Sequence, residues 1–134
     1  KIINSCIDKY INRSTNSFSF TSLGQIKYLS LLNQVDGVIG NSSSGIIEAP
    51  SLRKGTINIG DRQLGREKAQ SVIDCGYEVG DISKAIKLLY SKNFNKVVKK
   101  SKNPYFKSNT SKNIVNKIES LSLDGILFKY FFDQ

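Results

Sequence analysis

Apolar residues recur every three to four positions in several parts of the chain, the spacing that places them along one side of a helix. The segments with this spacing predict six helices, over residues 1–11, 22–35, 43–52, 81–92, 94–99 and 111–121. Ser22 and Asp81 stand at the start of the second and fourth segments and are the expected N-caps. Pro50 has no backbone N–H to donate, so it is expected to end or bend the third helix.

Short segments between these helices predict the strands. Residues 17–21 alternate in polarity with period two, and residues 36–41 form a short run expected to be buried. Residues 54–60, flanked by glycines, and residues 71–76 are also strand-like. Strands that alternate with helices favour right-handed βαβ units and hence a parallel sheet. The predicted fold class is therefore α/β, a Rossmann-like parallel sheet flanked by helices, over residues 1–121. An apolar tail, residues 122–134, follows it.

The 134 residues suit a single domain, and their net charge of +9 raises the question of a nucleic-acid partner. The basic residues concentrate between Lys84 and Lys107, where their spacing scatters them around helices with apolar residues on the other side. That pattern is typical of a solvated helix face, and neither a recognition helix nor an aromatic RNA-binding platform accompanies it. We therefore expect no nucleic-acid partner. No apolar run approaches the ~20 residues of a membrane span, so no membrane partner is expected either.

Two residue types limit the chemistry. The chain has no histidine, which removes the usual general base near neutral pH and the commonest transition-metal ligand. Its two cysteines, Cys6 and Cys75, are too few for a disulfide framework and lack the spacing of a metal site. We expect free thiols in a reducing cytoplasm, and no metal or organic cofactor.

The segment IGNSSSGIIEAPS, residues 39–51, places four small polar residues at the end of a predicted strand. In an open parallel sheet, ligands bind beyond the carboxyl ends of the strands, where the next helix begins. Small side chains such as those of Ser42 and Ser43 leave backbone N–H groups accessible there, add hydroxyl donors, and lie at the positive end of the helix dipole. These features suit a phosphate or diphosphate.

Glu48 lies about one turn into the following helix. Its carboxylate would repel a phosphate, but it is suited to accept hydrogen bonds from the two vicinal hydroxyls of a ribose, as the acidic residue of dinucleotide sites does. A second interpretation stays open, in which Ser42 and Ser43 only cap the helix and Glu48 is a solvated surface residue.

The segment NIGDRQLGR, residues 58–66, follows the next predicted strand and so reaches the same edge of the sheet. Its two arginines, Arg62 and Arg66, can each fork onto phosphate oxygens. The alternative is that they pair with Asp61 or Glu67 on the surface.

Taken together, GNSSSGIIEAPSLRKGTINIGDRQLGR resembles the C-terminal domain of the UDP-N-acetylglucosamine 2-epimerases. The upstream SLGQIKYLSLL and the downstream NPY fit the same family, so the resemblance covers residues 1–117. It is strongest to the hydrolysing branch, which starts sialic acid and related nonulosonate biosynthesis for surface polysaccharides. The non-hydrolysing branch typically has a first loop richer in glycine and acidic residues and lacks the RQxGR form of the second.

The resemblance implies a GT-B architecture, two Rossmann-like domains with UDP bound mainly by the C-terminal one. It implies that Ser42 and Ser43 bind the diphosphate, that Glu48 holds the ribose hydroxyls, and that Arg62 lies beside the nucleotide. Further residues are candidates for the loops near the uracil ring and the phosphates: Ser22, Leu23, Gly24, Gln25, Ser44, Gly45 and Arg66.

Catalysis in the family relies on acidic residues of the N-terminal domain and on a histidine early in the C-terminal domain. We therefore expect this chain to be a C-terminal fragment that lacks its first strand, binds UDP or UDP-N-acetylglucosamine, and is inactive alone. The expected partners are the N-terminal domain of the same enzyme and a second copy of the chain. The whole enzyme would remove the C2 proton, eliminate UDP to give 2-acetamidoglucal, and add water to give N-acetylmannosamine.

Two rival interpretations remain. One is the UDP-sugar domain of a non-hydrolysing 2-epimerase or a GT-B glycosyltransferase, which shares the fold and the ribose-binding carboxylate. The other is a basic, non-catalytic interaction domain. The apolar tail, residues 122–134, is expected to pack on the N-terminal domain, or else to complete the core of this one.

Overall fold

The structure is a computed structural model, and it describes residues 2–125 and 127. The chain groups into two compact units, Lys1–Pro104 and Tyr105–Gln134. The first unit contains the sheet, and the described part of the second contains one helix.

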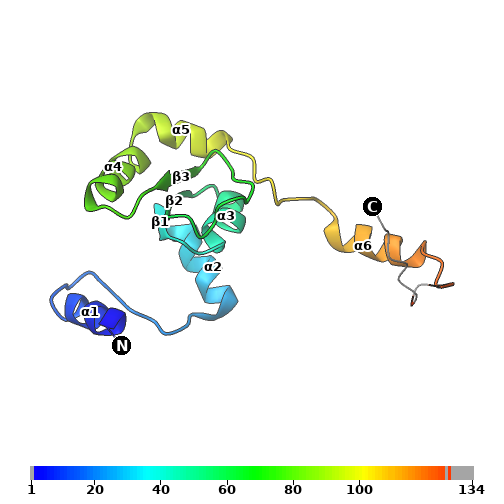
Figure 1. Cartoon of the computed structure of the whole chain (residues 1–134), viewed down its shortest axis with the longest axis horizontal. Helices are drawn as coiled ribbons and strands as arrows, with labels where there is room; N and C mark the ends of the chain where they lie inside the picture. The colour runs from blue at the N-terminus through cyan, green and yellow to red at the C-terminus, as the bar shows by residue number, and fades with distance from the viewer. Residues whose placement is uncertain (1, 126, 128–134) are drawn as a thin grey trace, which may run out of the picture. The chain divides into compact units, whose positions relative to one another are not determined.

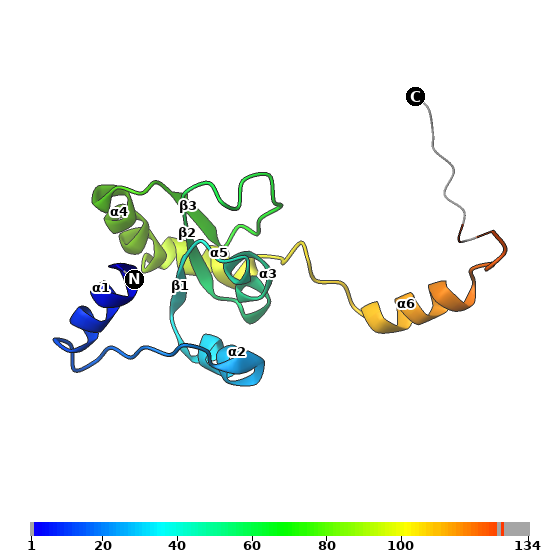
Figure 2. The ribbon, with the colours of Figure 1, turned by 60° about the horizontal axis from the view of Figure 1, so that its bottom comes forward.

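Three parallel strands form the sheet, in the order β1-β2-β3: Gly37–Gly40, Gly55–Ile59 and Val72–Cys75. The helices, in chain order, are α1 (Ile2–Ile11), α2 (Gly24–Gln34), α3 (Ser44–Ile47), the 3₁₀ helix η1 (Ala49–Leu52), α4 (Val79–Leu89), α5 (Lys92–Lys100) and α6 (Thr110–Glu119). The predicted α/β fold class with a parallel sheet is confirmed (Figures 1 and 2).

Helices cover both faces of the sheet (Figure 1). On one face, α4 and α5 pack over β2 and β3 and form the apolar cluster of Ile57, Ile73, Ala85, Phe94 and Val98. On the other face, α3 and η1 pack against β2 and bury Ile46 and Ala49 completely. Because side chains alternate along a strand, β2 contributes Ile57 to the first face and Thr56 to the second.

The predicted strand over residues 17–21 is wrong. This segment has no regular structure, and its two phenylalanines, Phe18 and Phe20, are 79% and 61% exposed. Alternating polarity favours a strand only where a neighbouring strand and an apolar face are available, and neither lies beside this segment among the described residues.

Both predicted N-caps are also wrong. Helix α2 begins at Gly24, whose φ of +66° turns the chain sharply, so the Ser22 hydroxyl only approaches Gly24 N, at 3.4 Å, and Leu23 is the N-cap. Helix α4 begins two residues before Asp81, and Glu78 is its N-cap. Asp81 instead lies in the first turn, where its charge still favours the helix dipole.

The predicted helix over residues 43–52 consists of one α-helical turn followed by one 3₁₀ turn, and Pro50 lies in the second. α3 ends at Ile47, so its backbone dipole is that of a single turn.

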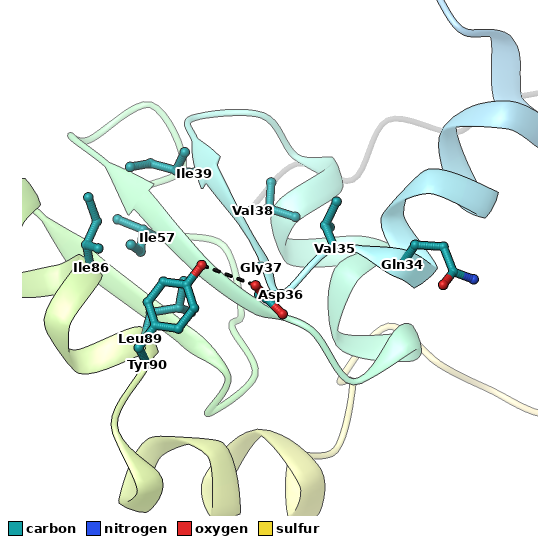
Figure 3. A pocket seen from close by; sticks show the side chains of 10 residues that line it. All are labelled: Gln34, Val35, Asp36, Gly37, Val38, Ile39, Ile57, Ile86, Leu89 and Tyr90. Carbon is teal, nitrogen blue, oxygen red and sulfur yellow. Dashed lines mark hydrogen bonds between the residues drawn. The ribbon is translucent and has the colours of Figure 1, made fainter. Parts of the chain in front are cut away.

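The strand predicted to be buried over residues 36–41 forms as β1 but is only half-buried, and within the described residues it pairs with β2 alone. An open groove of about 410 Å³ runs between β1 and α4 (Figure 3). It is lined by Gln34, Val35, Asp36, Gly37, Val38, Ile39, Ile57, Ile86, Leu89 and Tyr90. The Tyr90 hydroxyl donates a hydrogen bond to Asp36 Oδ2 at 3.3 Å beside this groove.

The second unit contains α6 and a turn at Gly125, and it buries no described residue. Of the predicted apolar tail, Leu123 and Leu127 are exposed, while residues 126 and 128–134 lie outside the described residues. No helix in the described part of the chain is long and apolar enough to cross a membrane.

Candidate functional site

Two polar loops meet at the carboxyl edge of the sheet. The serine loop, residues 41–44, follows β1, and the arginine loop, residues 60–66, follows β2. Because β1 and β2 are parallel neighbours, both loops leave the sheet at the same edge. Gly40, with φ of +147°, and Gly60, with φ of +74°, turn the chain out of the two strands, in backbone conformations that side chains disfavour.

The serine loop leaves two backbone donors free. The carbonyls of Ser42 and Ser43 accept the N–H groups of Gly45, Ile46 and Ile47, which starts α3. The N–H groups of Ser42 and Ser43 themselves donate to no acceptor within the described part of the chain. Two adjacent free N–H groups next to hydroxyl side chains are a typical anion site.

The capping alternative applies only weakly to these serines. Ser43 is the N-cap of α3 by position, but its hydroxyl makes no capping hydrogen bond. The Ser42 hydroxyl accepts from Ser44 N at 3.3 Å, a long contact.

Glu48 is not a solvated surface residue. It is half-buried at the junction of α3 and η1, and its Oε2 atom is fully buried without a hydrogen-bond partner among the described residues. A buried carboxylate oxygen without a donor is costly, because the lost hydration is not replaced. The oxygen therefore has the capacity to accept hydrogen bonds from a ligand.

Arg62 reaches from the arginine loop to the serine loop, where its Nη1 lies 3.4 Å from Asn41 Oδ1. Arg66 is exposed on the same loop. Neither arginine forms an ion pair with Asp61 or Glu67 among the described residues, so the surface-pair alternative is not what the structure shows. Asp61 instead accepts a hydrogen bond from the Tyr77 hydroxyl at 2.9 Å.

The other candidate residues have different surroundings. Ser44 is hydrogen-bonded to the Tyr28 hydroxyl of α2. Gly45 is buried against β2, where a Cβ would lie 2.6 Å from Thr56 Cγ2, so this glycine is required for packing. Residues 22–25 lie at the beginning of α2, about one turn before Tyr28. The structure thus brings the serine and arginine loops together and links α2 to them through Tyr28.

Sequence reasoning missed Gln63 and Tyr28. Gln63 is buried in the arginine loop, and its Nε2 donates to the Asn41 carbonyl at 2.8 Å. Its place directly after Arg62, in a loop with glycines at 60 and 65, is the only sequence signal, and a neutral amide attracts less attention than the arginines of the same loop. Tyr28 lies inside the helix predicted over residues 22–35, and its spacing alone does not distinguish it from a residue that only packs.

A charged residue, Asp74, lies on β3, the strand next to β2. Asp74 accepts hydrogen bonds from Asn58 Nδ2 and Lys68 Nζ at 2.7 and 2.8 Å. Burial opposes the ionisation of Asp74, but the hydrogen bonds from Lys68 and Asn58 outweigh it and lower the pKa of the carboxyl below 3.8. Burial, with the nearby charges of Asp81 and Asp74, raises the pKa of the Cys75 thiol.

Comparison with known proteins connects this geometry to a family. The sequence profile described as "UDP-N-acetylglucosamine 2-epimerase" matches residues 1–119. The "Polysialic acid biosynthesis protein P7" of Escherichia coli is 43% identical over 126 residues, 93% of this chain and 32% of that protein. The "GDP/UDP-N,N'-diacetylbacillosamine 2-epimerase (hydrolyzing)" of Campylobacter jejuni is 41% identical over 134 residues, 98% of this chain and 34% of that protein. The chain therefore spans about a third of the length of these curated relatives. On the match over residues 1–119, the chain belongs to the UDP-N-acetylglucosamine 2-epimerase family.

Proposed function

We propose that this chain is the UDP-binding part of a hydrolysing 2-epimerase, and that the serine loop, Glu48 and Arg62 hold the nucleotide. The observation that carries the proposal is the buried, unpartnered Oε2 of Glu48, which lies one helical turn after two free backbone N–H groups. An anion-binding loop suits the diphosphate of UDP, and a carboxylate acceptor after it suits the hydroxyls of the ribose.

The diphosphate would bind at the serine loop. The N–H groups and hydroxyls of Ser42 and Ser43 supply neutral donors, and Arg62 supplies a positive charge from the neighbouring loop. Hydrogen bonds from a charged donor to a phosphate are about twice as strong as neutral ones. Because α3 has only four residues, the backbone donors matter here more than a helix dipole.

Glu48 would accept the vicinal ribose hydroxyls. Two hydroxyl donors would satisfy the carboxylate. Because Oε2 is covered in the structure, the Glu48 side chain would turn toward the site to accept a hydrogen bond there. This arrangement predicts selectivity for ribonucleotides, because a deoxyribose removes one of the donors.

The reaction of the whole enzyme is part of the proposal. The names of the relatives include a hydrolysing 2-epimerase and a polysialic acid biosynthesis protein, which favours release of UDP and an N-acetylmannosamine-type sugar. The residues of this chain would orient the nucleotide and stabilise the departing diphosphate, as donors aimed at developing charge do. The acid–base groups would come from other parts of the enzyme, and the proposal assigns this chain no metal or organic cofactor.

Calorimetric titration of the chain with UDP tests the proposal, with Glu48→Gln as the site variant and Glu78→Gln as the matched control. Glu78 is exposed at the start of α4 and is not among the residues assigned to the nucleotide, so the control makes the same change of charge outside that set. Losing hydrogen bonds to a buried carboxylate costs about 1.5–3 kcal/mol, so we expect Glu48→Gln to weaken UDP binding roughly tenfold to a hundredfold.

The control should bind UDP like the unchanged chain. Absence of UDP binding by a folded chain, or equal binding by both variants, would overturn the assignment.

A further inference from the structure

Gln63 is the only buried residue of the arginine loop, with 3% of its surface exposed. Its backbone belongs to the turn, because its carbonyl accepts the N–H of Arg66 at 3.3 Å. Its side chain extends away from that turn and reaches the serine loop, 22 residues earlier in the sequence. A buried amide that spans two loops requires a reason beyond filling space, since burying it costs free energy unless its polar atoms are bonded.

Gln63 contacts the peptide group that joins Asn41 and Ser42. Its Nε2 donates to the carbonyl oxygen of Asn41 at 2.8 Å. That carbonyl and the N–H of Ser42 belong to the same planar, trans peptide unit, so they point in opposite directions. Holding the carbonyl toward Gln63 therefore turns the Ser42 N–H away from it, and this N–H has no acceptor in the described part of the chain.

The residue before Asn41 adds little restraint of its own. Gly40 has φ of +147°. A Cβ added at Gly40 would have no atom within 4 Å, apart from those of its two neighbours in the chain. A glycine restrains its own φ and ψ little, so Gly40 leaves the direction in which the chain enters Asn41 adjustable. Apart from the bond with Gln63, the side-chain contact to Asn41 among the described residues is the 3.4 Å approach of Arg62 Nη1 to its Oδ1.

We propose that Gln63 is a positioning residue, which locks the Asn41–Ser42 peptide plane so that the Ser42 N–H faces the site of the diphosphate. The inference rests on the proposed UDP site and adds the residue that orients it. The second polar atom of Gln63, Oε1, is buried and has no partner in the described part of the chain, so the amide is held there by its donor side alone. Replacing that donor by an acceptor should therefore release the peptide.

Three variants separate positioning from packing. Gln63→Glu keeps the shape but sets a carboxylate oxygen against the Asn41 carbonyl. Gln63→Met keeps a similar volume and removes the donor without adding charge. Gln70→Glu makes the same chemical change at an exposed glutamine of the same connection between β2 and β3.

Two measurements read out the variants. Amide ¹H–¹⁵N NMR spectra of the chain without ligand report the Ser42 N–H directly. Calorimetric titration with UDP reports the consequence for binding. We expect the Ser42 resonance to shift in Gln63→Met and Gln63→Glu but not in Gln70→Glu. We also expect UDP affinity to fall about tenfold in Gln63→Met and further in Gln63→Glu.

The outcomes distinguish this inference from the proposed function. An unchanged Ser42 resonance in the Gln63→Met variant, or unchanged UDP affinity in both Gln63 variants, would overturn the positioning role. If the unchanged chain binds no UDP, the proposed function fails, and the Ser42 resonance alone then decides whether Gln63 holds the peptide. If Gln63→Glu does not fold, the neutral Gln63→Met carries the test.

Discussion

Both faces of strand β2 are buried, but different interactions hold them. On the α4 and α5 side, Ile57 packs in a cluster with Phe94 and Val98, where no polar contact is required. On the other side, Thr56 and Asn58 are 2% and 1% exposed. Thr56 Oγ1 donates to the Gly45 carbonyl at 2.7 Å, and Asn58 Nδ2 donates to Asp74 at 2.7 Å.

The difference between the faces separates stability from site geometry. Apolar contacts are non-directional and contribute most of the free energy of folding. Hydrogen bonds contribute less net stability but depend on direction, so they determine where backbone groups point. The polar side of β2 faces α3, where the serine loop enters its first turn. We therefore expect substitutions on the apolar side to change stability alone, and substitutions on the polar side to change ligand binding as well.

The largest effect is expected on the apolar side. Phe94→Ala should lower the free energy of unfolding by about 3–5 kcal/mol, because it removes a buried ring and leaves a cavity. Denaturant titration measures this loss, and Phe106→Ala is the control because Phe106 is exposed. UDP affinity of the folded fraction should not change. A loss of affinity at full folding would contradict the separation of the two faces.

A smaller loss of stability, accompanied by a loss of binding, is expected for Gly45→Ala on the polar side. The new Cβ would lie 2.6 Å from Thr56 Cγ2, so α3 must move, at a cost of about 1–3 kcal/mol. Thr56→Ser removes that methyl group and keeps the hydroxyl, so the double variant should recover both stability and UDP affinity. If Thr56→Ser rescues neither, the contact is not the cause of the effect.

The sequence predicted the general architecture because the patterns that carry it are local. The spacing of apolar residues within short segments was enough to predict alternating helices and strands, and hence a parallel sheet. The strand over residues 17–21 failed because pairing depends on neighbours that its own pattern cannot report. The N-caps at Ser22 and Asp81 failed because a helix start depends on backbone angles at single residues.

The candidate site shows the same limit. Ser42, Ser43 and Arg62 follow from their places after strand ends, and the structure puts their loops at one edge of the sheet. Glu48 follows from its place about one turn after the serines. Gln63 could not be assigned in this way, because its contact joins residues 22 positions apart. The unpartnered state of Glu48 Oε2 is equally a property of three-dimensional packing.

The smallest effect is expected from the ion pair between Lys68 and Asp74. Asp74 lies on β3 and accepts a hydrogen bond from Asn58 on the polar side of β2. The pKa of Asp74 is lowered in the folded state, so this carboxylate stabilises the fold above its unfolded pKa near 3.8. The contribution is lost as pH falls through the lower, folded value. Because more than half of the side chain is exposed, we expect a small change. Thermal unfolding at pH 7 and pH 3 should show a slightly smaller acid destabilisation in Asp74→Asn than in the unchanged chain. Equal acid destabilisation in both would contradict the shift.

The most direct test of the central claim is the coupling between Glu48 and the ribose 2′-hydroxyl. The unchanged chain and Glu48→Gln would each be titrated with UDP and with 2′-deoxy-UDP. If Glu48 holds the ribose, the unchanged chain should bind 2′-deoxy-UDP about tenfold more weakly than UDP, whereas Glu48→Gln should bind the two almost equally. The same loss for 2′-deoxy-UDP in both proteins would contradict the account, because the 2′-hydroxyl would then be bound elsewhere.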